Sequence, residues 1–214
     1  MRPALQATTL TLVAGIADAV GYLTMGGIFA ANMTGNTVLA GIALAQGDYG
    51  HALYQFAALA AFVVGAVLSH FLLRLTARPT AGLLAEAVLI AGIGFLPIQP
   101  ELQAMIVAAA MGLQASAITQ FGGVSISTVV ITSTLARIAD SLLDRFRPVD
   151  AKSERSAALN LHLLPLSWAG YLAGAFAGTL MIAILPWPLL AAAVLLLLML
   201  VFCSGDTTEP KSQS

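Results

Sequence analysis

The chain has few charged side chains. Aspartate, glutamate, lysine and arginine together make up 9% of its 214 residues, whereas soluble globular domains carry roughly 25%. So small a share excludes a water-facing surface around a domain of this size. Hydrophobic residues reach 59% and are gathered into long runs. The composition therefore predicts an integral membrane protein.

Other residue types are scarce as well. The one cysteine, Cys203, excludes an internal disulfide and a cysteine-based metal site. The net charge of −1, without any basic run, argues against nucleic acid as a partner. The sequence contains no nucleophile–base pair, phosphate-binding motif or metal-ligand cluster, and an enzyme would need one of them. We expect a protein that is not an enzyme, has no cofactor and no metal, and has the lipid bilayer as its partner.

Eight apolar segments can be recognised, at about 8–25, 33–46, 52–73, 80–98, 102–120, 127–144, 162–185 and 187–204. A full crossing needs roughly 20 residues, and the second and sixth segments are shorter. Each of these two follows a Gly-Gly pair, so it can form one discontinuous crossing with its predecessor. The sequence predicts an all-α polytopic membrane protein with six crossings, and eight separate membrane segments are the alternative.

Positive charges help to decide between the two counts. Lysine and arginine cluster at Arg2, at Arg74 with Arg78, and between residues 137 and 155, while the linkers near 47–51, 97–101 and 185–188 carry none. Six crossings place all three clusters in the cytoplasm, as the positive-inside rule requires. We expect a multi-pass protein of the bacterial inner membrane with both termini cytoplasmic and a cytoplasmic loop at 145–160.

The two halves of the chain resemble each other. Residues 26–43 (GGIFAANMTGNTVLAGIA) align without gaps with residues 122–139 (GGVSISTVVITSTLARIA), and Asp18 falls opposite Gln114. The repeats extend over about 1–98 and 102–204 within a single membrane domain, 1–214. Three crossings per half is an odd number, so the second half enters the membrane inverted. Interruptions at matching places in two inverted halves are the best sequence indication of a transporter's binding site.

The Gly-Gly pairs predict where the first helix of each half breaks, because glycine adopts backbone angles that other residues avoid. The polar and glycine residues that follow the breaks are Asn32, Thr34, Gly35 and Asn36 in the first half and Thr132 and Thr134 in the second. They can cap a restarted helix, whose N-terminus attracts anions. Either the two breaks meet at the membrane midplane around one wet cavity, or each is a hairpin capped at the surface.

Several of these strings resemble a known family. The runs Asp18-Ala-Val-Gly-Tyr-Leu-Thr, Gly26-Gly-Ile-Phe and Asn32-Met-Thr-Gly-Asn-Thr resemble the YoaK-like family of small bacterial membrane proteins. Met111-Gly-Leu-Gln-Ala and Gly122-Gly-Val resemble the family's second-half signature. Where the family usually has Thr-Gly-Thr, this chain has Thr132-Ser133-Thr134. The resemblance covers nearly the whole chain and implies a membrane fold, but the family has no established activity to transfer.

Asp18 and Glu86 are the acidic residues inside apolar segments. A charge there costs on the order of 3 kcal/mol or more and is a functional candidate by default. Asp18 leads into the first break, and we expect it to bind a proton or a cation, with a hydrogen-bonded structural role as the alternative. Glu86 stands opposite Ala192 in the repeat and is the weaker candidate.

The candidate substrate-binding residues are Asp18, Asn32, Thr34, Gly35, Asn36, Gln114, Thr132 and Thr134. The sequence favours a permease for an unknown small solute, of which an anion is one candidate, bound at the midplane between the two broken helices. The alternative is a non-transporting membrane module that acts as a sensor, an assembly partner or a structural element.

Gly170, Gly174 and Gly178 recur at every fourth residue. Small residues at this spacing form one helix face on which a second backbone can approach closely. This face packs either against another helix inside the fold or, as the alternative, at the seam of a homodimer.

Overall fold

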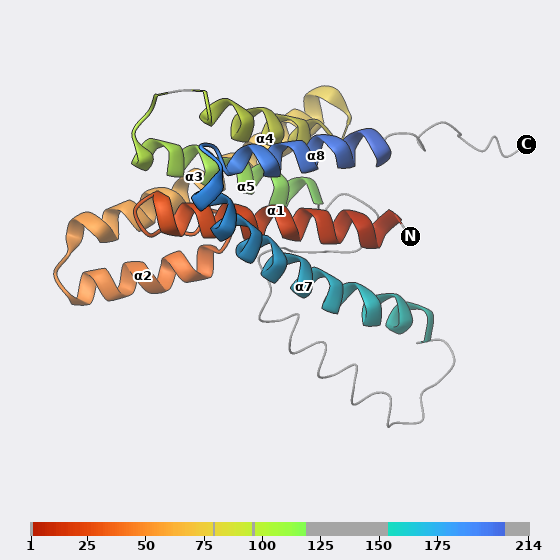
Figure 1. The fold of residues 1–214 in the computed structure, drawn as a ribbon, viewed down its shortest axis with the longest axis horizontal. Helices are drawn as coiled ribbons and strands as arrows, with labels where there is room; N and C mark the ends of the chain where they lie inside the picture. The colour runs from red at the N-terminus through yellow and green to blue at the C-terminus, as the bar shows by residue number, and fades with distance from the viewer. Residues whose placement is uncertain (1, 79, 96, 119–153, 204–214) are drawn as a thin grey trace, which may run out of the picture.

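The computed structural model describes residues 2–78, 80–95, 97–118 and 154–203, and its regular elements in these ranges are all helices. They are α1 (Arg2–Thr24), α2 (Met33–Ala45), α3 (Tyr49–Thr76), α4 (Thr80–Ile93), α5 (Pro100–Ile118), α7 (Glu154–Ile184) and α8 (Leu189–Cys203). The helices form a bundle that α7 crosses obliquely (Figure 1). The predicted segment 127–144, and with it Thr132 and Thr134, lies outside the described residues.

Local signals set several helix ends. Asp48 caps α3 by accepting a hydrogen bond from the His51 N–H at 3.0 Å. Pro100 is the first residue of α5, where the missing N–H of proline costs nothing. α7 starts at Glu154, so residues 154–160 of the segment predicted as a loop are helical, while 145–153 lie outside the described residues.

The helix connections gather at two opposite ends of the bundle (Figure 1). The start of α1, the α3–α4 turn and the end of α8 lie at one end, whereas residues 46–48, 94–95 and 185–188 lie at the other. The rings of Phe95 and Trp187, with centroids 5.2 Å apart, join two of these connections. α1, α4 and α7 therefore run in one direction, and α3, α5 and α8 run in the other.

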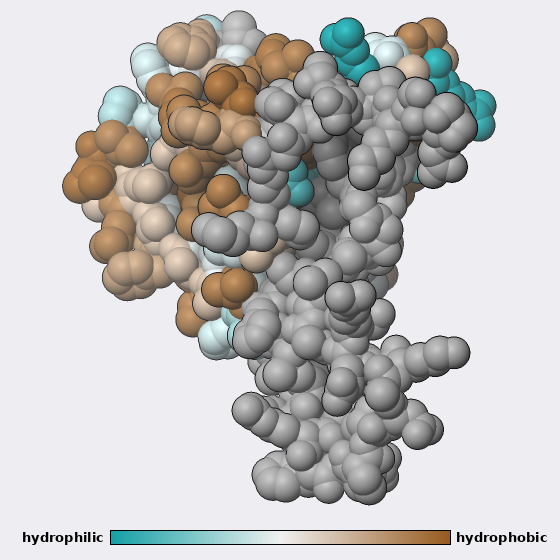
Figure 2. Space-filling model, turned by 90° about the vertical axis from the view of Figure 1, so that its right-hand side faces the viewer, coloured by the Kyte–Doolittle hydropathy of each residue, from teal (hydrophilic) through white to brown (hydrophobic). Residues whose placement is uncertain are grey.

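Much of the outer surface is apolar. Three described stretches are long and apolar enough to cross a membrane, namely Ala4–Thr24, Tyr49–Thr76 and Pro165–Ile184. Exposed hydrophobic side chains follow α3 along its length: Leu53, Val63, Val64, Val67, Phe71 and Leu75. Figure 2 shows one end of the bundle. The described residues there are mostly hydrophobic, and the hydrophilic ones gather at the upper edge. Apolar surface of this extent suits lipid rather than water.

The glycine stripe of α7 faces α1 of the same chain. A Cβ atom at Gly174 would collide with the backbone carbonyl of Leu12, and Gly170 and Gly178 lie against neighbouring turns of α1. α1 packs more extensively on α7 than on any other described helix. The stripe is therefore used inside the fold, and its interpretation as the seam of a homodimer is wrong.

A matching pair of contacts joins helices of the two halves of the chain. A Cβ atom at Gly15 on α1 would collide with the carbonyl oxygen of Tyr171 on α7. Likewise, one at Gly112 on α5 would collide with the carbonyl oxygen of Phe62 on α3. Phe62 and Tyr171 each begin a similar string, Phe62-Val-Val-Gly-Ala in the first half and Tyr171-Leu-Ala-Gly-Ala in the second. α5 thus packs on α3 in the way that α1 packs on α7.

Replacing Gly174 by leucine should force α1 and α7 apart, because the clash is with backbone atoms. Overpacking typically costs about 1–3 kcal/mol, and we expect Gly174→Leu to lose at least that much stability. Ala173→Leu changes the exposed neighbouring position and is the matched control. Thermal unfolding in detergent measures both. A Gly174→Leu protein as stable as Ala173→Leu would contradict the observed packing.

Candidate functional site

The chain leaves the helix between α1 and α2, at the place predicted from its first Gly-Gly pair. Gly26 and Gly27 both have φ of 76°, in the left-handed region that favours glycine. Helix resumes after Asn32, whose side chain caps α2 by accepting a hydrogen bond from the Gly35 N–H at 3.1 Å. The predicted first break is therefore confirmed, and it covers residues 25–32.

The break is buried inside the bundle. Ile28, Ala30 and Ala31 are each exposed by 3% or less. A buried backbone group without a hydrogen-bond partner costs about 1–3 kcal/mol, so an unwound segment here needs polar partners. Side chains from α1, α2 and α3 supply them, and a residue of α7 supports the partner on α1.

Asp18 on α1 is the central partner of the break. Its side chain is 2% exposed, and its Oδ1 accepts hydrogen bonds from the N–H groups of Ala31 and Asn32, at 2.5 and 3.2 Å. Its Oδ2 accepts a hydrogen bond from the Tyr171 hydroxyl at 2.5 Å. The carboxyl group lies at the N-terminus of α2, where the helix dipole favours a negative charge. One buried group thus joins α1, the break and α7.

Asn36 on α2 holds the middle of the break. Its Oδ1 accepts a hydrogen bond from the Phe29 N–H at 2.8 Å, and its Nδ2 donates one to the Phe29 carbonyl at 2.7 Å. The amide thereby pairs both backbone groups of one residue, as a neighbouring strand would. Tyr22 stacks on the Phe29 ring at 4.8 Å. Gly35 leaves room for this ring, because a Cβ atom there would lie 2.7 Å from a ring carbon.

Two partners on α3 were not identified from the sequence. The Tyr54 hydroxyl donates a hydrogen bond to the Met25 carbonyl at 2.8 Å, and Gln55 Nε2 donates one to the Gly27 carbonyl at 3.2 Å. Tyr171 on α7 was missed as well. All three are polar residues in otherwise apolar helices, and this is the signal that could have identified them.

Four of the predicted site residues lie together at the break: Asp18, Asn32, Gly35 and Asn36. Thr34 is exposed on the first turn of α2, and Thr132 and Thr134 lie outside the described residues. The structure therefore brings together the predicted first-half site residues other than Thr34. Their role in binding a solute stays a prediction.

Gln114 lies apart from this group. Its side chain is 1% exposed and donates a hydrogen bond to the Leu10 carbonyl on α1 at 3.2 Å. Leu10 is about 12 Å from Asp18 along the helix axis. Gly15 on α1 and Gly112 on α5 make matching contacts. When these two glycines are aligned, Asp18 falls opposite Ala115 and not opposite Gln114.

Three buried side chains have oxygen atoms without a hydrogen-bond partner among the described residues. These atoms are Gln55 Oε1, Gln114 Oε1 and both carboxyl oxygens of Glu86. The three side chains are exposed by 1% or less. Because amide and carboxylate oxygens accept hydrogen bonds, a group that completes them must be a donor, a proton or a cation.

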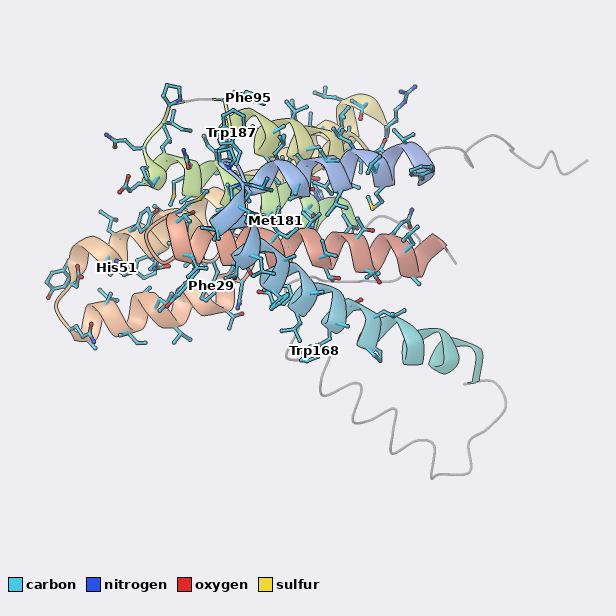
Figure 3. All side chains as sticks on the ribbon, viewed as in Figure 1. Phe29, His51, Phe95, Trp168, Met181 and Trp187 are labelled. Carbon is cyan, nitrogen blue, oxygen red and sulfur yellow. The ribbon has the colours of Figure 1, made fainter. Side chains whose placement is uncertain are left out.

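A cavity of about 350 Å³ opens at the end of the bundle that holds residues 94–95 and 185–188. Its volume lies within the range of small-molecule sites. α1 lines it with Val20 and Thr24, and Met25 adds the first residue of the break. Trp187 is part of the lining, and Figure 3 shows it beside Phe95. The cavity therefore reaches the break from this end of the molecule.

Comparison with known sequences finds relatives over most of the chain. Residues 6–202 match the family described as "Protein of unknown function (DUF1275)". The "UPF0700 transmembrane protein YoaK" of Bacillus subtilis (strain 168) is 31% identical over 149 residues, 64% of this chain and 65% of that protein. The "UPF0700 transmembrane protein RA0705" of Rhizobium meliloti (strain 1021) is 30% identical over 173 residues, 81% of this chain and 73% of that protein. The match thus spans less than two thirds of the first relative. No solved structure matches the chain.

Removing the Tyr171 hydroxyl should leave one oxygen of Asp18 without its partner. A hydrogen bond to a charged group contributes about 1.5–3 kcal/mol, so we expect Tyr171→Phe to destabilise the protein by that amount. Tyr22→Phe is the matched control, since it keeps the ring that stacks on Phe29. Thermal unfolding of both variants, and of each combined with Asp18→Asn, gives the coupling energy. Additive effects of Asp18→Asn and Tyr171→Phe would show that the two groups do not interact.

Proposed function

The chain belongs to the DUF1275 family, whose curated relatives are transmembrane proteins, and from this premise we propose that it is a permease for a small solute. The resemblance to YoaK-like sequences is thereby confirmed, and the chain is a membrane protein. The observation that carries the proposal is the buried break of α1–α2. Unwound backbone at membrane depth occurs where protein buries it or where it lines a wet cavity. In transporters such breaks form the substrate site.

The proposed architecture has six crossings in two inverted halves. It is supported by the matching contacts of α1 with α7 and of α5 with α3, and by the opposite directions of α1 and α5. A two-fold axis in the membrane plane relates such halves. Both termini then lie in the cytoplasm of a bacterium, at the end of the bundle that also holds Arg74 and Arg78.

The solute proposed here carries hydrogen-bond donors. Asp18 already places its own carboxyl group at the N-terminus of α2, so an added anion there would meet a like charge. Beside the break, Gln55 offers a free acceptor, Oε1. The cavity that reaches Met25 supplies an entry of suitable volume. A neutral or cationic small molecule fits this arrangement better than the anion considered from the sequence.

A second candidate function is favoured by a separate observation. Asp18 and Asn36 direct their hydrogen bonds to groups of the chain itself, as expected for a packed module that acts as a sensor or an assembly partner. A homodimer stays part of either proposal, on a face other than the glycine stripe. The permease and the non-transporting module differ in whether a solute crosses the membrane through the protein.

A thermal-shift screen followed by uptake into proteoliposomes tests the permease. The panel contains neutral amides and polyols, small ammonium compounds, and carboxylates with inorganic anions. We expect a compound with hydrogen-bond donors to stabilise the protein and to enter the proteoliposomes. Gln55→Met should abolish both effects. Gln46→Leu, at an exposed position at the end of α2, is the matched control.

Two results would count against the permease. Stabilisation that Gln55→Met leaves unchanged would place the solute elsewhere. A folded protein that transports none of the compounds in the panel would favour the non-transporting module.

A further inference from the structure

Glu86 on α4 is a buried carboxyl group that the proposed solute site does not use. Its side chain is 0% exposed, and neither oxygen has a hydrogen-bond partner among the described residues. The same face of α4 carries Leu83, Ala87 and Ile90, which are also buried. A charged carboxylate is unstable in such surroundings, so the group needs a proton or a cation.

Among the described residues, the neighbouring helix α5 offers Glu86 no polar side chain at its own depth. A Cβ atom at Gly82, one turn earlier on α4, would lie 2.8 Å from Ser69 Oγ on α3 and 3.3 Å from Ala117 on α5. Because α4 and α5 are antiparallel, Glu86 lies level with about residues 109–113 of α5. These residues read AAMGL and carry no polar side chain.

Titratable side chains on the helices packed against α4 are few. Those that the structure describes are Tyr49, His51, Tyr54, His70 and Arg74 on α3 and Glu101 on α5. His70 follows Ser69, the residue beside Gly82, and its Nδ1 lies 2.7 Å from Ser116 Oγ. The others lie nearer to helix ends. No described charge therefore compensates that of Glu86.

A proton fits these surroundings better than a metal ion. A metal ion needs several ligating atoms around it, and the described part of the chain contains no group of three or more His, Cys, Asp or Glu side chains that could hold one. A proton needs one oxygen atom only. It leaves a neutral carboxyl group, which costs far less to bury than a carboxylate.

The cavity at the end of the bundle lies one helical turn from Glu86. Its lining includes Ile90 and Ile93, which belong to the same buried face of α4. Ile90 is one helical turn from Glu86, about 6 Å along the axis, and is 1% exposed. One turn of apolar side chains thus separates the carboxyl group from the cavity.

We propose that Glu86 is a proton-binding site, loaded from this cavity, and that its protonation is coupled to solute movement. The coupling rests on the proposed permease function, whereas proton binding does not. One proton joins a carboxylate oxygen and later leaves it, and no other bond changes. Asp18, whose oxygens are paired with the break and with Tyr171, then holds the structure and does not carry the proton.

Labelling with dicyclohexylcarbodiimide tests the proton site. This apolar reagent enters membrane interiors and reacts with a protonated carboxyl group to give a stable acylurea, which peptide mass spectrometry locates. In the full-length protein in liposomes we expect label on Glu86, more at acidic than at alkaline pH, and none on Asp18. Glu86→Gln should remove the label. A water-soluble carbodiimide with an amine should instead modify the exposed Glu101, which serves as the accessibility control.

Unlabelled Glu86 in protein whose Glu101 reacts normally would overturn the proposal. Protection of Glu86 from labelling by sodium ions, compared with potassium ions at equal ionic strength, would overturn it in favour of a metal-cation site.

Thermal unfolding gives an independent test of the proposal. Glu86→Met replaces an unpaired carboxyl group by an apolar side chain of similar size, so its melting temperature should equal or exceed that of the wild type. A fall as large as that of Asp18→Asn would make Glu86 a structural residue and overturn the proposal.

The uptake assay separates this proposal from the permease. Labelled Glu86 in a protein that transports no solute would support the proton site and refute transport. Uptake that responds to pH in the wild type and loses this response in Glu86→Gln would support the coupling. Uptake with the same pH response in both proteins would refute it.

Discussion

The buried hydrogen bonds of Asp18 are the interaction on which the described structure depends. An unwound backbone within a membrane protein has N–H groups that hydrocarbon cannot satisfy. Asp18 accepts hydrogen bonds from two of them, at Ala31 and Asn32, and Tyr171 donates to its other oxygen. Without this carboxyl group the break would either rewind into helix or leave unpaired groups in the bundle. The break and its carboxyl partner therefore require each other.

Close helix packing makes this arrangement possible. Gly15, three residues before Asp18 on α1, lets the backbone of α7 approach closely at Tyr171. The same approach brings the Tyr171 hydroxyl within 2.5 Å of the carboxyl group. Packing and polar pairing are thus two aspects of one interface, and this interface fixes the position of the break.

Features that depend on local backbone preference were predicted from the sequence, and partners distant in the chain were not. Gly26-Gly27 and the cap at Asn32 marked the break, and a carboxyl group in an apolar segment marked Asp18. Tyr171 lies 153 residues from Asp18 in the chain, and one sequence does not reveal which helices touch. For the same reason the glycine stripe was recognised as a packing face while its partner stayed open. The start of α7 at Glu154 was missed because a polar stretch such as 145–160 carries no apolar periodicity that would indicate a helix.

Hydrogen–deuterium exchange of the break in lipid nanodiscs tests the central claim most directly. If Asp18 holds a buried, unwound segment, the amides of Ala31 and Asn32 should exchange as slowly as those in the middle of α1. Asp18→Asn should accelerate their exchange and leave the amides at 46–48 unchanged. Exchange of Ala31 and Asn32 in the wild type at the rate of an unstructured chain would contradict the account, because the break would then be open to water and independent of its carboxyl group.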